Sequence, residues 1–302
     1  MAAPNTLPDL AAPAPAERGR RTPADRRDRR SPGVGKVLGY VVLALAAAGL
    51  LLPFFWMVSS SLKTDSGVFA IPVSWFPESP QWGNYVEIWR ISDMLVWLKN
   101  TVFLSVVVTA LQLFTGSFAA YGFAKARFPG RNVLFLVYIG TIAVPWQAYM
   151  IPQFIMMSEV GLTNTPWAVI ALQAFSAFGV FLMRQYYMTI PDELCEAARV
   201  DGLSEYGIYF RIMLPLSVPA LASLALLTFV TTWNDYLGPL IYLRDPDLWT
   251  IQLGLKSFVS EYNAEHALIM TGSVLSVVPI AVVFLLGQKY FVQGVATSGL
   301  KG

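Results

Sequence analysis

Six segments of this chain are each apolar over the length needed to cross a lipid bilayer, and no other feature constrains the fold as strongly. A membrane-spanning helix needs about 20 consecutive, mostly apolar residues, because a helix satisfies its own backbone hydrogen bonds inside hydrocarbon. The sequence therefore predicts an all-α, polytopic membrane protein with six transmembrane helices. The segments cover residues 37–59, 98–123, 133–154, 167–183, 218–242 and 268–291.

Charged residues are scarce, and the residue types that usually carry catalysis or metal binding are scarcer still. Charged residues make up 13% of the chain, against about 25% in soluble domains. A single cysteine, Cys195, excludes an intramolecular disulfide, and a single histidine, His266, leaves no His-rich metal site. The chain also has no phosphate-binding loop and no HExxH or GxSxG motif. We therefore expect no catalytic residue, no metal site and no cofactor in this chain, which is not expected to be an enzyme.

The first 34 residues differ from the rest because they are rich in Ala, Pro and Arg and poor in large apolar side chains. Such a segment cannot bury enough surface to fold, so residues 1–34 are expected to form a disordered basic arm ahead of a transmembrane domain over residues 35–302. The arm either binds anionic lipid or nucleic acid, or is a solvated tail that only fixes topology; the second interpretation is favoured. Its arginines are Arg18, Arg20, Arg21, Arg26, Arg27, Arg29 and Arg30.

The distribution of basic residues predicts the orientation of the six segments. With six spans, 16 of the 21 Lys and Arg residues fall on the side that holds both termini and the loop between the fourth and fifth segments. The positive-inside rule places that side in the cytoplasm. The opposite side holds Lys63, Arg90, Lys99, Arg244 and Lys256.

The loop over residues 191–215, called the elbow below, is the longest charged and helix-competent stretch between apolar ones. Pro191 suits a first helical turn, and Asp192 suits the positive end of the helix dipole. Gly202 is placed to end this helix, and Ser204 can cap a second helix that stops before Pro215. The sequence predicts a helix–glycine–helix element beside the membrane, whose small residues let another protein approach its backbone. That is a docking element.

Polar and aromatic residues inside the apolar segments are candidates for a translocation path, because they are costly there. In the fifth segment Asp235 supplies an acid, and its neighbours supply the aromatic faces and the amide that suit a neutral sugar. Asp235 can instead brace the helix bundle near the outer interface, with Trp233 in an aromatic belt, and the sequence leaves both interpretations open. A weaker set follows Pro145 in the third segment. The candidates are Trp233, Asn234, Asp235, Tyr236, Trp146 and Gln147.

The elbow also carries a specific spacing of residues. Glu196-Ala197-Ala198 is followed after three residues by Gly202, and after nine more by Ile212-Met213-Leu214-Pro215. This spacing resembles the EAA loop of ABC importer permeases. Several other segments resemble the carbohydrate-uptake branch of that family, and the terminal Lys301-Gly302 is similar to the tail of G-type maltose permease subunits. These segments are residues 161–165, 181–185, 190–202 and 233–236.

The resemblance, which covers about residues 98–302, implies a role for the elbow and a set of partners. The elbow would be the coupling helix that sits in a cleft of a cytoplasmic ATPase, with Glu196 as a charged contact and Gly202 as a hinge. The partners would be a second permease subunit of the maltose-permease F type, an ATPase homodimer that binds ATP and Mg²⁺, and an extracytoplasmic sugar-binding protein. The coupling residues implied are Glu196, Ala197, Ala198, Asp201, Gly202, Ile212, Leu214 and Pro215.

The expected function is a transmembrane permease subunit of an ATP-driven, binding-protein-dependent importer for a sugar or oligosaccharide. Three alternatives stay open: a permease for glycerol phosphate or another polar solute, a secondary transporter, and a membrane scaffold that recruits a cytosolic partner. A phosphate substrate calls for Arg or Lys facing the path, and the apolar segments show none except Lys99 and Lys289 at their ends, which favours a neutral sugar. A secondary transporter is disfavoured because no inverted repeat is visible.

Overall fold

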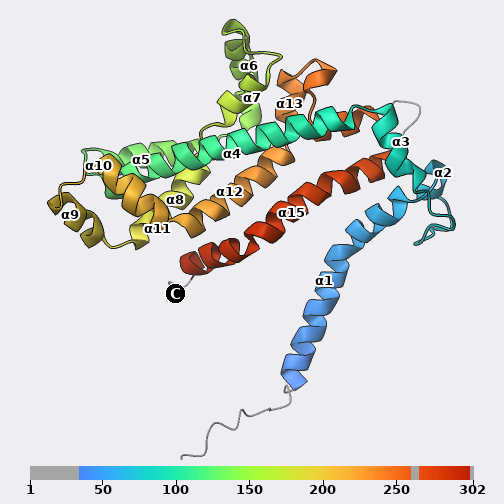
Figure 1. The fold of residues 1–302 in the computed structure, drawn as a ribbon, viewed down its shortest axis with the longest axis horizontal. Coiled ribbons are helices and arrows are strands. Elements are labelled where there is room, and N and C mark those ends of the chain that lie inside the picture. The colour runs from blue at the N-terminus through green and yellow to red at the C-terminus, as the bar shows by residue number, and fades with distance from the viewer. Residues whose placement is uncertain (1–33, 260–264, 300–302) are drawn as a thin grey trace, which may run out of the picture. The chain divides into compact units, whose positions relative to one another are not determined.

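The computed structural model describes residues 34–259 and 265–299, and in that part of the chain every element of regular structure is helical (Figure 1). The expected all-α fold is confirmed. The predicted basic arm, apart from its last residue, and the terminal Lys301-Gly302 lie outside the described residues. The α-helices are α1 (Val34–Ser61), α2 (Asp65–Val68), α3 (Gly83–Ile91), α4 (Met94–Lys125), α5 (Arg131–Gly140), α6 (Met150–Glu159), α7 (Pro166–Gln173), α8 (Ala177–Thr189), α9 (Asp192–Val200), α10 (Glu205–Ile208), α11 (Leu214–Leu216), α12 (Val218–Trp233), α13 (Leu237–Tyr242), α14 (Ile251–Ser257) and α15 (His266–Gly299).

Contacts between residues divide the chain into two units, Met1–Leu52 and Pro53–Gly302, and the boundary falls inside α1. In the first unit the described residues form the N-terminal part of α1, whose apolar side chains are exposed, as expected of a helix that faces lipid. In the second unit the long helix α4 packs along α8 and α12, and α12 packs on α15. These four helices position the two candidate sites.

Four helical segments in the described part of the chain are long and apolar enough to cross a membrane: Gly35–Ser61, Met94–Lys125, Pro166–Thr189 and His266–Lys289. A fifth is obtained if Glu205–Leu216 and Val218–Trp233, which meet at a bend of 78°, are counted as one span. The number of spans is therefore four or five by this measure, and the count of six stays a prediction.

The third predicted span is interrupted at Pro145, one of the two prolines in its sequence. Its apolar helix covers Arg131–Ala143 and stops before Pro145. Short 3₁₀ turns, Thr141–Ala143 and Trp146–Ala148, then lead into α6. Proline has no N–H to donate and disfavours helix in the residue before it, so Pro145 divides the segment into two short pieces.

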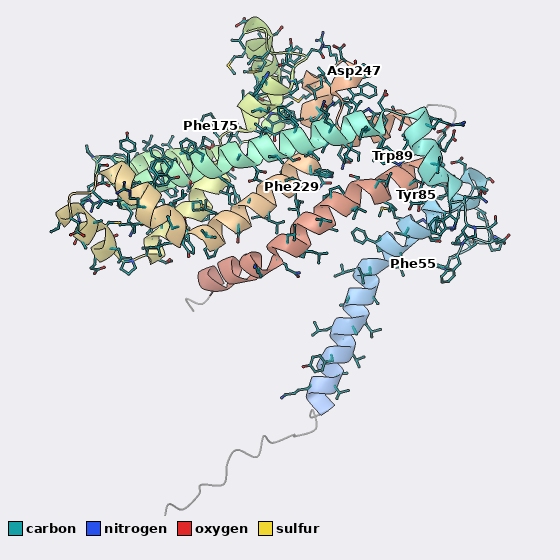
Figure 2. The ribbon with its side chains drawn as sticks, viewed as in Figure 1. Phe55, Tyr85, Trp89, Phe175, Phe229 and Asp247 are labelled. Carbon is teal, nitrogen blue, oxygen red and sulfur yellow. The ribbon has the colours of Figure 1, made fainter. Side chains whose placement is uncertain are left out.

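The fourth span is also interrupted, between α7 and α8, and two polar side chains of α4 compensate for the interruption. Gln112 donates from Nε2 to the carbonyl of Gln173, and Thr115 donates from Oγ1 to the carbonyl of Ala174, both at 2.7 Å. Phe175 lies in the same break and exposes 70% of its surface (Figure 2). Because hydrocarbon offers no donor to a freed carbonyl, these bonds make the break tolerable inside a membrane.

Small residues bring the central helices together. A Cβ built on Gly116 of α4 would lie 3.6 Å from the backbone carbon of Gly179 in α8. A Cβ on Gly179 would lie 3.3 Å from Cδ1 of Leu224 in α12. Glycine at these positions lets the helix backbones approach closely, as is common in membrane bundles. The elbow connects α8 to α12 and lies at the C-terminal end of α4 (Figure 1).

Candidate functional site

The elbow has the helix–glycine–helix form that its sequence predicts. The first helix, α9, ends at Val200, and Gly202 follows its C-cap with a φ of +83°, in the left-handed region that favours glycine. Ser204 then caps α10 by accepting a hydrogen bond on Oγ from the backbone N–H of Gly207 at 3.2 Å. Pro191 stands at the N-cap of α9, one position before the first helical turn.

Ion pairs hold the elbow against the end of α4. The ammonium of Lys125, whose side chain is 4% exposed, donates to the carbonyl of Ile190 at 2.6 Å and to the carboxylate of Asp192. The hydrogen bond from Lys125 lowers the pKa of the Asp192 carboxyl below its ordinary value, so Asp192 is ionised at neutral pH. Arg127 donates to Glu196 at 3.1 Å, and that pair is largely exposed. One buried and one exposed pair therefore fix the elbow.

The two faces of α9 differ in what they contact. Cys195 and Ala198 are buried against the helices, and the Sγ of Cys195 lies 3.7 Å from the Sδ of Met213. The opposite face is open to solvent and includes apolar side chains: Leu194 is 44% exposed and Val200 is 88% exposed. Apolar side chains exposed on a short charged helix are typical of a surface that another protein covers.

The predicted coupling residues divide between these faces. Ala198 is buried, while Ile212 and Leu214 are half-buried and pack against the same core. The exposed members, which a partner can reach, are Glu196, Ala197, Asp201, Gly202 and Pro215.

The elbow continues into α12 through a π-helical turn over Tyr209–Met213 and the bend of 78° that follows α11. The Tyr209 hydroxyl and Ser117 Oγ of α4 are 2.7 Å apart, so they form a hydrogen bond inside the bundle. At the bend, Ser217 donates from Oγ to the carbonyl of Leu214 at 2.9 Å. These two hydrogen bonds join the elbow to α4 and hold its junction with α12.

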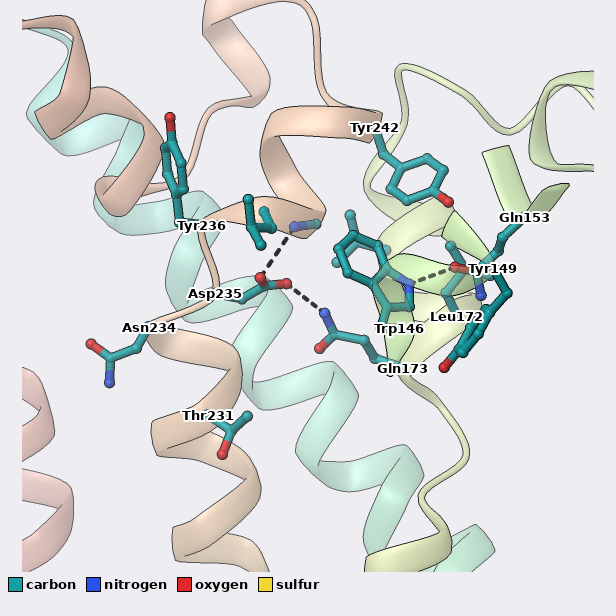
Figure 3. A pocket seen from close by; sticks show the side chains of 13 residues that line it. Trp146, Tyr149, Gln153, Leu172, Gln173, Thr231, Asn234, Asp235, Tyr236 and Tyr242 are labelled. Atoms are coloured by element: carbon teal, nitrogen blue, oxygen red, sulfur yellow. Dashed lines mark hydrogen bonds between the residues drawn. The ribbon is translucent and has the colours of Figure 1, made fainter. Parts of the chain in front are cut away.

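A second site is a pocket of about 490 Å³ that brings both predicted path sets together (Figure 3). Its volume falls in the range of about 300–1,000 Å³ usual for small-molecule sites. The walls come from the turn before α6, from α6 and α7, from the end of α12 and from α13. The lining residues are Trp146, Tyr149, Gln153, Val169, Leu172, Gln173, Thr231, Asn234, Asp235, Tyr236, Leu237, Gly238 and Tyr242.

Asp235 is half-buried in this pocket and is held by a side-chain amide and by the backbone N–H groups of Leu237 and Gly238. Its Oδ2 accepts a hydrogen bond from Nε2 of Gln173 at 2.7 Å, and its Oδ1 accepts one from the backbone N–H of Gly238 at 3.1 Å (Figure 3). Gln173 is positioned in turn by Thr232, which donates to its Oε1 at 3.3 Å. A Cβ on residue 238 would lie 2.4 Å from Oδ2 of Asp235, so glycine there leaves room for the carboxylate.

Aromatic side chains form the other side of the pocket. Trp146 donates from Nε1 to Oε1 of Gln153 at 2.8 Å, which fixes the indole, and Tyr149 is 42% exposed beside it (Figure 3). Tyr242 is 1% exposed, and its hydroxyl makes no hydrogen bond to any residue that the structure describes. In Figure 3 this hydroxyl is directed toward the side that holds Gln153 and Tyr149.

The structure separates the predicted path residues. Trp146, Asp235 and Tyr236 line the pocket, and Asn234 lines its rim with the amide turned away from Trp146 (Figure 3). Trp233 does not line the pocket: it is fully buried, stacks on Phe229 and donates from Nε1 to the carbonyl of Ser276 in α15 at 3.1 Å. Gln147 is exposed outside the pocket.

Sequence reasoning missed Gln153, Gln173 and Tyr242. Gln173 carried a usable signal, because it is an amide near the centre of an apolar segment, where polar side chains are costly. Tyr242 carried none, since a tyrosine at the end of an apolar segment is common at a membrane interface.

The family model described as "Binding-protein-dependent transport system inner membrane component" matches residues 112–297, which include the elbow and every residue of the pocket. The match covers more than half of the 302 residues. The chain belongs to this family. It is accordingly a membrane-embedded permease component of a transport system, and not an enzyme.

Individual relatives of this inner membrane component agree with the match. The arabinooligosaccharides transport system permease protein AraQ of Halalkalibacterium halodurans is 34% identical over 268 residues, covering 88% of this chain and 95% of the relative. The lactose transport system permease protein LacG of Rhizobium radiobacter is 36% identical over 270 residues, covering 89% of this chain and 97% of the relative. The resemblance to carbohydrate-uptake ABC permeases is confirmed.

A solved structure supports the same fold for this inner membrane component. One chain of a bacterial ABC transporter involved in the import of the acidic polysaccharide alginate superposes with a TM-score of 0.76 at 27% sequence identity. The superposition covers 87% of this chain and 98% of that chain, so the similarity extends over nearly the whole of both.

Proposed function

We propose that this chain is the permease subunit of an ATP-driven, binding-protein-dependent importer for a sugar or oligosaccharide. It forms half of the translocation path and pairs with a second, unlike permease subunit. An ATPase homodimer binds below, and an extracytoplasmic binding protein delivers the sugar from above. The relatives named for arabino-oligosaccharide and lactose transport support a carbohydrate cargo.

The geometry of the elbow is the observation that carries this proposal. Its solvent face combines the carboxylate of Glu196 with the small Ala197 and the exposed Val200. The left-handed backbone of Gly202 then turns the chain after this helix. The far end of the elbow joins α12 at a bend. A push from an ATPase on α9 therefore reaches a transmembrane helix, which is the mechanical link that ATP-driven transport needs.

The orientation follows from the same proposal, because an ATPase is cytoplasmic. The elbow and both termini then lie on the cytoplasmic side, as the positive-inside distribution predicts. A membrane-impermeant maleimide tests this. In a Cys195→Ser background, Ala197→Cys puts a thiol at an exposed position. We expect labelling only in inside-out vesicles; labelling of intact cells would contradict the orientation.

The coupling role is tested by reconstituting the complex of this chain with its own partners and measuring sugar-stimulated ATP hydrolysis. Glu196→Lys reverses the charge on the docking face, and Gly202→Pro demands a φ of about −65° where the chain has +83°. We expect each variant to lose about 10-fold or more of the stimulation while still inserting into the membrane. Glu78→Lys, an exposed charge reversal outside the elbow, is the matched control and keeps full stimulation. Normal coupling in both elbow variants would overturn the proposal.

A further inference from the structure

We infer that the pocket between α6, α7 and α13 is a subsite for an uncharged saccharide unit, and that it discriminates against acidic sugars. This inference rests on the proposed import function, which it deepens by assigning a binding site to this subunit and a substrate class to that site. Four features of the pocket carry it: unused acceptor capacity, an unpartnered hydroxyl, aromatic walls and the sign of the charge.

The unused acceptor capacity belongs to Asp235. An ionised carboxylate accepts roughly four hydrogen bonds. The protein supplies three of them, from Nε2 of Gln173 and from the backbone N–H groups of Gly238 and Leu237. These donors hold the carboxylate at the pocket wall, and its remaining lone pair is free to accept from a ligand. Vicinal hydroxyl groups of a sugar are donors of that kind, and they bind a carboxylate with charge-assisted hydrogen bonds.

The unpartnered hydroxyl belongs to Tyr242. A buried polar atom without a partner is unfavourable, and native proteins leave few of them. Tyr242 lines the pocket, and its hydroxyl is closed off from solvent and has no partner among the described residues. A ligand oxygen in the pocket would supply the missing hydrogen bond. The unpaired hydroxyl of Tyr242 is thus an independent indication that a polar ligand binds here.

The aromatic walls suit the less polar surface of a sugar ring. Trp146 is locked by its hydrogen bond to Gln153, and the partly exposed Tyr149 lies beside it. Val169, Leu172 and Leu237 complete an apolar floor. Small-molecule sites combine mostly apolar walls with a few fixed polar groups, and this lining has that composition.

The charge of the pocket selects among sugars. The lining residues all belong to the described part of the chain, and they include one carboxylate and no Lys, Arg or His. A uronate or a phosphorylated sugar would place a second negative charge near Asp235 without a compensating cation. Like charges in a partly desolvated site repel more strongly than in water. A neutral saccharide meets no such barrier.

Photo-crosslinking tests the site without depending on transport. Diazirine analogues of lactose and of digalacturonate are irradiated with the purified complex, and the labelled peptides are identified by mass spectrometry. We expect the lactose analogue to label peptides that contain Trp146 or Tyr242, and the digalacturonate analogue to label them about 10-fold less. Equal labelling by both, labelling only elsewhere, or no labelling at millimolar concentration would each overturn the inference.

Tyr242→Phe separates a binding role from a structural one. It removes a hydroxyl that has no partner in the free protein, so thermal stability should stay unchanged or rise. Pocket labelling by the lactose analogue should fall about 3- to 10-fold, the value of one hydrogen bond. Thr250→Val is the matched control, because Thr250 is also a buried hydroxyl without a partner but lies outside the pocket. It should leave labelling unchanged, and an equal fall in both variants would contradict the inference.

Asp235→Asn tests the selectivity. It keeps the shape of the side chain and removes its charge, so the preference for the lactose analogue over the digalacturonate analogue should shrink about 10-fold; an unchanged ratio would overturn the inference. Glu196→Lys separates the two proposals. It should abolish coupling and leave pocket labelling intact, so a failure of the importer proposal and a failure of the subsite give different results.

Discussion

The elbow and the pocket are both built from polar side chains, but the two regions use them differently. In the elbow the charged groups face water, and they pair across its rim with the end of α4. In the pocket one carboxylate is held from inside the bundle by an amide and two backbone N–H groups. Water can replace most contacts of the elbow, whereas it reaches the half-buried Gln173 and Asp235 only from the pocket side. Polar contacts therefore contribute most to stability where they are few and buried.

The largest effect is expected for Gln173→Leu. The substitution removes the donor to Asp235 and the acceptor of Thr232 together. We expect a loss of about 3 kcal/mol of stability, since a hydrogen bond to a charged group is worth more than a neutral one. The melting temperature of the protein in nanodiscs measures it. Gln147→Leu makes the same chemical change at an exposed position outside the pocket and should leave the melting temperature as it was. Similar losses in both variants would show that the network around Asp235 does not brace the bundle.

Lys125→Met is expected to come second, because it removes the buried cation that anchors the start of α9. The ammonium satisfies the carbonyl of Ile190 as well as Asp192, so its loss leaves a carbonyl without its donor. A loss of about 2 kcal/mol is expected, confined to the elbow. Hydrogen exchange of the α9 amides should then accelerate by roughly 30-fold while the exchange of α4 stays slow. Acceleration throughout α4 would mean that the anchor stabilises the whole bundle.

Gly202→Ala is expected to have a smaller effect that comes from the backbone alone. Open space surrounds this glycine, so an added methyl group meets no atom, but a φ of +83° is strained for alanine by about 1 kcal/mol. Exchange in α9 should accelerate about 5-fold. Gly207→Ala provides the control within the same elbow, since its φ is not in the positive range and its nearest neighbours are at ordinary contact distance. If Gly207→Ala has the larger effect, the left-handed turn is not what shapes the elbow.

Arg127→Met should have the smallest effect. Its pair with Glu196 is largely exposed, and exposed pairs contribute little and are screened by salt. We expect α9 exchange to change by less than about 3-fold at low salt and the difference to vanish near 1 M NaCl. An effect as large as that of Lys125→Met would show that the exposed ion pair stabilises α9 as much as the buried cation does.

The sequence by itself determined the class of fold and the local form of the elbow. Apolar segments of bilayer length have few alternatives to helix, and Gly202 and Ser204 act on their immediate neighbours, so their effect is readable in the chain. The EAA spacing likewise identified the family. These features depend only on residues that are close in the sequence, and not on the helices packed across the bundle.

Only the tertiary structure decided which polar residues share a site. Trp233 and Asp235 are two positions apart, yet Trp233 packs into the core against α15 while Asp235 faces the pocket. Gln173 and Tyr242 reach that pocket from distant parts of the chain. The reason is that side-chain direction in an apolar helix is set by the neighbours it packs against, and a helix that is apolar all round does not indicate where they lie.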